Sequence, residues 1–128
     1  MAGYSGTPLP RKLGIKEGAR VRLAGAPAGF ASTLGVEARP RGEAVVIVLF
    51  SRTADDMARR FPGLRKALHP AGGLWVAWPK KASGVATDLS ESVVRGYGLS
   101  QGLVDNKVCA IDDTWSGLRF VVRLSDRA

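Results

Sequence analysis

The chain of 128 residues has only one cysteine, Cys109, and one histidine, His69. A single cysteine excludes an internal disulfide and a zinc site of four cysteines, and a single histidine leaves too few ligands for the other common zinc sites. We therefore expect no metal and no resident cofactor. So little cysteine fits the reducing cytoplasm, where we expect the protein to be located.

Long apolar runs are also lacking. The longest spans residues 44–50, far fewer than the roughly 20 residues of a membrane-spanning helix. The first residues, "MAGYSGTPLPRKLG", contain no apolar signal core, so we expect neither export nor a membrane partner. This length predicts one α/β domain over residues 15–128, preceded by an N-terminal arm over residues 1–14.

Acidic residues are few: 11 Asp and Glu face 19 Lys and Arg, giving a net charge of +8 and a pI near 10.4. Such an excess favours nucleic acid, a phosphate-bearing ligand or an acidic partner. The basic residues form no dense run, however, and an arginine-rich composition raises the pI without any partner. Nucleic-acid binding therefore stays an alternative.

Alternation in "GARVRLAG" predicts a strand that ends near Gly25, and the Gly and Pro that follow predict a turn and a short helix up to Gly35. "AVVIVLF" is typical of a parallel strand buried on both faces. Thr53 is positioned to cap a helix that Pro62 breaks or restarts and Pro70 ends.

"GLWVAW" predicts a strand that places Trp75 and Trp78 on opposite faces of a sheet and ends at Pro79. Residues 88–102 predict a helix with Asp88 as its N-cap.

Residues 103–111 and 118–124 predict two strands joined by a hairpin turn, "DDTWSG". The order of elements indicates an α/β fold: a mostly parallel, Rossmann-like sheet of about five strands, with helices on both faces and an antiparallel hairpin at the end.

The stretch "LRKALHPAGGLWVAWPK" resembles the helix, turn and fifth strand of class I methyltransferases, whose fold also ends in an antiparallel hairpin. The resemblance implies a truncated methyltransferase-like core. The glycine-rich loop of that family is poorly matched by "LAGAPAGF", in which Pro27 removes a backbone N–H donor. An S-adenosylmethionine or nucleotide-like cofactor is therefore an alternative and not the main expectation.

Across nearly its full length the chain is similar to a family of small bacterial proteins known only as a domain of unknown function. "YSGTPLPRKLGIKEG", "GGLWVAWPKKASG" and "DDTWSGLRFVVR" carry this resemblance. It implies no activity and no catalytic residue.

Ligands of open parallel sheets bind beyond the carboxyl ends of the strands. We therefore expect four loops to share one edge: residues 25–29, 51–53, 79–84 and 112–117. The candidate ligand-binding residues in these loops are Gly25, Gly29, Arg52, Lys80, Lys81, Ser83, Asp112, Asp113, Thr114 and Trp115.

Each candidate has a structural alternative. Lys80 and Lys81 are either an anion site, aided by the N–H groups of "ASG", or partners of Asp112 and Asp113. The two aspartates are acid–base groups, a hard-cation site or turn formers. Trp115 either stacks on a ligand or folds over the end of the sheet.

Two further side chains have structural expectations. We expect Cys109 to be a buried core residue and His69 to lie at the end of a helix, far from Ser83.

These observations predict a non-catalytic Rossmann-like domain that binds an anionic small ligand or a protein partner at the carboxyl-end edge of its sheet. The first alternative is an enzyme that uses the same crevice, with a nucleotide-like cofactor or with the two aspartates. The second is nonspecific binding of nucleic acid.

Overall fold

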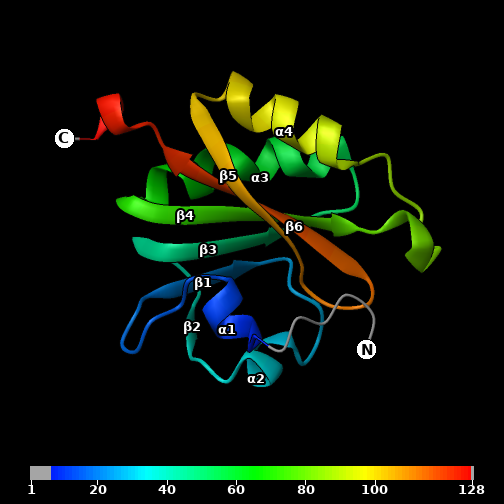
Figure 1. Ribbon diagram of the computed structural model, residues 1–128, viewed down its shortest axis with the longest axis horizontal. Coiled ribbons are helices and arrows are strands. Elements are labelled where there is room, and N and C mark those ends of the chain that lie inside the picture. The colour runs from blue at the N-terminus through cyan, green and yellow to red at the C-terminus, as the bar shows by residue number, and fades with distance from the viewer. Residues whose placement is uncertain (1–6, 128) are drawn as a thin grey trace.

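A computed structural model describes residues 7–127, so the part of the predicted arm over residues 1–6 lies outside the described residues. Six strands form one sheet in the order β2-β1-β3-β4-β6-β5 (Figure 1). The strands are β1 (Val21–Ala24), β2 (Ala38–Arg39), β3 (Ala44–Phe50), β4 (Leu68–Pro79), β5 (Leu103–Ala110) and β6 (Trp115–Val122). The helices are α1 (Leu9–Lys12), α2 (Phe30–Leu34), α3 (Ala54–Ala67) and α4 (Glu91–Ser100), with 3₁₀ turns η1 (Lys81–Ser83) and η2 (Leu124–Asp126).

The α/β class, the mostly parallel sheet and the terminal antiparallel hairpin are confirmed. Strands β1 to β4 pair in parallel, and β6 runs antiparallel to both of its neighbours, β4 and β5. The strand count of about five is too low. The additional strand, β2, has only two residues beside β1, too few to produce an alternating pattern in the sequence.

The expected helices on both faces are present in an uneven form. Helices α3 and α4 lie together on one side of the sheet, and the much shorter α1 and α2 lie on the other (Figure 1). Right-handed crossovers explain this, because β3–α3–β4 and β4–α4–β5 step across the sheet in the same direction and so place both helices on one face. The β1–α2–β2 connection steps the other way.

The sheet separates two apolar cores, one under each face. Trp78 belongs to the core beneath α3 and α4, whereas Trp75 belongs to the core beneath α1 and α2. The predicted placement of the two tryptophans on opposite faces is therefore confirmed, as is the end of β4 at Pro79.

Pro62 neither breaks nor restarts its helix, contrary to expectation, and α3 is continuous from Ala54 to Ala67. A proline lacks the N–H that would bond to the carbonyl four residues earlier, here that of Ala58. Tyr97 of α4 donates its hydroxyl to that carbonyl at 3.4 Å. A tertiary contact thus takes over the bond that the proline removes.

The caps of the two long helices also differ from the prediction in one respect. Thr53 caps α3 by accepting from the N–H of Asp56, as expected. Asp88 was expected to cap α4 but caps α3 instead. Its Oδ1 accepts from the N–H of Ala54, the first residue of α3, at 2.8 Å. Helix α4 is capped by Ser90.

The described part of the N-terminal arm is packed on the domain. Leu13 is fully buried in the second core, and its carbonyl accepts a hydrogen bond from Nε1 of Trp75 at 3.1 Å. Among the described residues, no helix is both apolar enough and long enough to cross a membrane.

We expect Leu13→Ala to lower the free energy of unfolding by about 2–5 kcal/mol, because it leaves a cavity beneath Trp75. The measurement is urea unfolding followed by tryptophan fluorescence. Leu124→Ala is the control, since Leu124 is 79% exposed and should change stability by no more than about 0.5 kcal/mol. Equal losses in the two variants would show that the arm does not contribute to the core.

Candidate functional site

The four predicted loops share one edge of the sheet. Strands β1, β3, β4 and β5 all point toward this edge, which we call the carboxyl-end edge. Hydrogen bonds join the loops to one another: Lys80 donates its N–H to the carbonyl of Thr114 at 2.7 Å, and Thr87 donates its hydroxyl to the carbonyl of Arg52 at 2.6 Å. The convergence on which the predicted site depends is therefore present.

A crevice of about 360 Å³ lies between the carboxyl ends of β1 and β3, and we call it the β1–β3 crevice. Here the chain leaves β1 toward one side of the sheet and β3 toward the other, which is the switch point where ligands of open α/β sheets bind. Its walls are Gly25, Pro27, Phe50, Ser51, Arg52, Thr53, Asp56, Arg60 and Trp115.

The crevice leaves no room for a side chain at Gly25. Its φ of 68° is in the left-handed region, and a Cβ there would lie 2.7 Å from both the carbonyl oxygen of Phe50 and Nη1 of Arg60. A side chain at residue 25 would therefore push Arg60 away from the crevice wall.

Three groups hold the carboxylate of Asp56 at the crevice. Ser51 donates its hydroxyl to Oδ2 at 2.5 Å, and Arg59 and Arg60 reach Oδ1 at 2.5 and 3.1 Å. The hydrogen bond from Ser51 and the charges of Arg60 and Arg59 hold the pKa of Asp56 below its usual value, although partial burial acts in the opposite direction. One carboxylate thus neutralises two guanidinium groups only in part.

Lys80 and Lys81 border a second hollow, of about 650 Å³, beside the loop that leads to α4. Asp88 and Glu91 lie in the same wall, so the lysine charges are balanced there. No ion pair in residues 7–127 joins either lysine to Asp112 or Asp113, so the predicted pairing is wrong. A backbone hydrogen bond holds these loops together instead.

Hydrogen bonds within the turn occupy much of the proposed "ASG" anion cradle. The N–H groups of Ser83 and Gly84 donate to the carbonyls of Lys80 and Lys81, and Val85 donates its N–H to the Ser83 hydroxyl. That hydroxyl in turn donates to the carbonyl of Lys80 at 2.6 Å. Ser83 therefore stabilises its own turn.

Asp112 is a turn former. Its Oδ1 accepts from the N–H groups of both Thr114 and Trp115 at 2.8 Å, which closes the hairpin turn between β5 and β6. Asp113 is exposed. Trp115 is 6% exposed and packs edge-on against Phe50, 5.1 Å between ring centroids, so it covers the end of the sheet.

The remaining candidates lie outside both hollows. Gly29 is the N-cap of α2 and has open space around it, so it approaches no other group. His69 lies in β4 and not at a helix end, where its Nδ1 accepts from the N–H of Ala71. Cys109 is only half-buried in β5, since β5 is an edge strand, and burial raises the pKa of its thiol.

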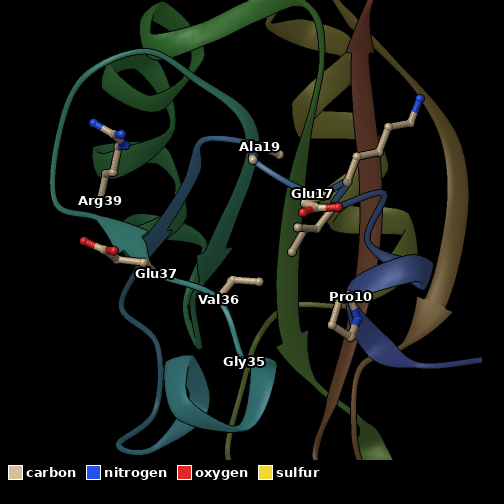
Figure 2. Close-up of a pocket in the computed structure, with 10 residues that line it drawn as sticks. Pro10, Glu17, Ala19, Gly35, Val36, Glu37 and Arg39 are labelled. Atoms are coloured by element: carbon tan, nitrogen blue, oxygen red, sulfur yellow. The ribbon is translucent and has the colours of Figure 1, made fainter.

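A third hollow, of about 450 Å³, lies at the opposite edge, between the loop before β1 and the segment that joins α2 to β2. Figure 2 shows Glu17 on one wall and Glu37 and Arg39 on the other, with Pro10 of α1 at the side. Lys16 also lines it, so two cations face two carboxylates, all of them exposed or on the rim. This balance favours no class of ligand.

A scan against protein-family models and a search of curated proteins found no match to this chain. Among the described residues, no group of three or more His, Cys, Asp or Glu side chains is placed to hold a metal ion. The chemistry of the site therefore has to be argued from its own geometry.

Two charged residues of the crevice wall, Asp56 and Arg60, were not among the predicted ones. A signal for them exists in the sequence, because they are four residues apart in the first turns of a helix that begins at the predicted edge. Which hollow they would line depends on the order of the strands.

We expect Gly25→Ala to destabilise the protein more than Gly29→Ala does. Both glycines have positive φ, so each substitution should cost about 1–2 kcal/mol in backbone strain. Only Gly25→Ala adds a collision with Phe50 and Arg60, which should cost at least about 1 kcal/mol more. Chemical denaturation measures the difference. Equal losses of unfolding free energy in the two variants would show that Phe50 and Arg60 move aside without cost.

The lowered pKa of Asp56 predicts a pH dependence of stability. A carboxyl whose pKa is lower in the folded state stabilises the fold above its unfolded pKa, about 3.9, and loses that contribution as the pH falls through its folded pKa. As the pH falls through this range, the free energy of unfolding should therefore drop more steeply for the wild type than for Asp56→Asn. Ser51→Ala should raise the pKa of Asp56, which carboxyl ¹³C NMR titration measures directly. A pKa of Asp56 at or above about 3.9 in the wild type would contradict the hydrogen bond and ion pairs described for it.

Proposed function

We propose that the protein is a non-catalytic binding domain that holds an anionic small ligand in the β1–β3 crevice. The observation that carries this proposal is the incompletely neutralised charge of the crevice at the switch point of the sheet. Arg52 and Arg60 line it with only one carboxylate, Asp56, which is shared with Arg59. A half-buried cation such as Arg60, without full compensation of its charge, favours an anion.

Arg60 is the residue best placed to contact the ligand. Its Nε is engaged with Asp56, while its Nη1 lies against Gly25 at the crevice wall. A guanidinium has five N–H donors, so the outer nitrogens keep donors available for a carboxylate or phosphate oxygen. Arg52, which is exposed at the rim, adds a second positive charge.

The size of the crevice favours a small ligand or the anionic end of a larger one. Its volume of about 360 Å³ is at the lower end of the range for small-molecule sites. Trp115 and Phe50 supply an apolar wall, but their rings are buried against each other and leave little face for stacking.

The enzymatic alternative with Asp112 and Asp113 has weaker support. Oδ1 of Asp112 is engaged in its own turn, where it accepts two backbone N–H groups, and neither aspartate lines the β1–β3 crevice or the second hollow. Two alternatives remain. One is an enzyme that binds a nucleotide-like or S-adenosylmethionine-type cofactor in the β1–β3 crevice, and the other is a domain that binds a protein partner at the same edge. The ligand screen below distinguishes both from the proposed function.

We expect phosphate, a nucleotide or another small anion to raise the melting temperature by several degrees in a thermal-shift screen that also includes S-adenosylmethionine. Arg60→Gln should abolish the rise, because it removes the donors at the crevice wall. Arg59→Gln is the matched control: it also pairs with Asp56, but its side chain is 70% exposed and does not line the crevice.

Each result of the screen distinguishes the proposed function from its alternatives. A rise that both variants retain would place the ligand elsewhere and contradict the proposed site. A rise with S-adenosylmethionine or a nucleotide alone would favour the cofactor alternative, and no rise with any compound would favour a protein partner.

A further inference from the structure

The net positive charge of the protein is not located at the carboxyl-end edge. Five of its 19 Lys and Arg residues lie there: Arg52, Arg59, Arg60, Lys80 and Lys81. Six of its 11 Asp and Glu residues lie there as well: Asp55, Asp56, Asp88, Glu91, Asp112 and Asp113. The edge as a whole is close to neutral, which leaves fourteen cations and five carboxylates for the rest of the chain.

Five of these cations gather around the opposite end of β4, β6 and β5, near the C-terminus in Figure 1. We call this the amino-end surface, because β4 and β5 begin there. It consists of Arg65, Lys66, Arg119, Arg123 and Arg127.

Contacts connect the members of the amino-end surface. A Cβ on Gly102, just before β5, would lie 3.3 Å from Nη2 of Arg65, which places Arg65 at the start of that strand. Val122 pairs with Leu103 at the same point, so Arg123 follows directly beside it.

Further along, the side chain of Arg127 turns back toward β6, and its Nε donates to the carbonyl of Val122 at 3.0 Å. The charge of Arg127 also acts on Arg119 of β6, so the two side chains are neighbours. The cations therefore follow one another around this end of the sheet.

Arg119 is the most constrained of these cations. It lies across β4 so closely that a Cβ on Gly73 would collide with its Nε. Its Nη1 donates to the side-chain oxygen of Asn106 at 3.3 Å. Burial and the nearby charge of Arg127 both lower the pKa of Arg119, so this cation is held beside another cation without a carboxylate.

The remaining cations of the surface also lack carboxylate partners. In residues 7–127 the ion pairs join Asp56 to two arginines of α3 and join Arg95 to Glu91 and Asp105. None of these pairs includes a member of the amino-end surface. Its charge is thus available to an external anion.

The chemistry of this surface favours a duplex over a protein or a single strand. Protein interfaces depend on buried aromatic or apolar anchors, and single strands stack on exposed aromatic rings. Every aromatic side chain in the described residues is buried except the half-buried Tyr97. At this end of the sheet the exposed large apolar residues among those described, Leu99 of α4 and Leu124 of η2, lie on separate elements. Repeated cations without apolar anchors suit an evenly spaced phosphate backbone.

We propose that the amino-end surface binds the phosphodiester backbone of a nucleic-acid duplex without reading its sequence. The contacts are guanidinium and ammonium groups on phosphate oxygens, so affinity depends on salt and not on base order. This surface is separate from the β1–β3 crevice, and the two proposals stand or fall independently.

The test is fluorescence anisotropy of the full chain with labelled DNA and RNA duplexes of unrelated sequences. We expect binding at low salt that weakens steeply between about 50 and 200 mM salt. The triple variant Arg119→Gln, Arg123→Gln, Arg127→Gln should bind at least about tenfold more weakly, and its salt slope should fall by about three. Comparison of the DNA and RNA duplexes shows which backbone is preferred.

The matched control removes the same charge at the other edge, through Arg52→Gln, Lys80→Gln and Lys81→Gln. It should bind the duplex as wild type does. Should Arg119→Gln unfold the protein, the double variant Arg123→Gln, Arg127→Gln provides the same comparison with a smaller loss. Thermal melting verifies that each variant is folded.

Three results would overturn the proposal. The first is no binding to either duplex at low salt. The second is equal weakening by both triple variants, which would mean that binding follows total charge and not this surface. The third is tighter binding to polyglutamate than to the duplexes at equal salt, which would assign the surface to an acidic protein.

Discussion

The parallel pairing of β3 with β4 positions the chemistry at both ends of the sheet. These strands pair from Ala44 with Leu68 to Phe50 with Ala77, and both are buried on both faces in their central parts. Because the central parts of β3 and β4 are wholly apolar, these two strands supply no polar side chain there, and the segments at their two ends supply it instead. β1 pairs with the edge of β3 that β4 leaves free, and the chain leaves β1 and β3 toward opposite faces of the sheet. The β1–β3 crevice lies at this switch point.

The same arrangement separates the charges of the molecule. Helices that connect parallel strands begin at the carboxyl-end edge and end at the opposite edge, and carboxylates favour helix starts whereas cations favour helix ends. Helix α3 follows this rule, with Asp55 and Asp56 in its first turn and Arg65 and Lys66 in its last. Asp88 and Asp112 add carboxylates at the first edge, where they accept backbone N–H groups. Loop-holding carboxylates thus neutralise one edge and leave the excess charge at the other.

The two proposed sites differ in how their charge is arranged. In the β1–β3 crevice a few cations surround a single shared carboxylate, Asp56, in a space of molecular size. On the amino-end surface the cations are spread over β6, the segment that follows it and the end of α3, without carboxylate partners among the described ion pairs. The first arrangement suits one discrete anion and the second suits a repeating one, because binding geometry follows the spacing of the charges.

The sequence by itself determined the class of fold, the buried β3 and β4, the opposite placement of Trp75 and Trp78, the Thr53 cap and the shared edge of four loops. These follow from the period of apolar residues and from local turn chemistry, which act over a few neighbouring residues. Tertiary structure alone decided what a distant residue does: Tyr97 accommodates Pro62, Asp88 caps a helix other than its own, and Asp56 and Arg60 enter the crevice. It also placed scattered arginines on one surface. A local pattern carries no information on partners thirty or more residues away, because those contacts depend on strand order and crossover direction.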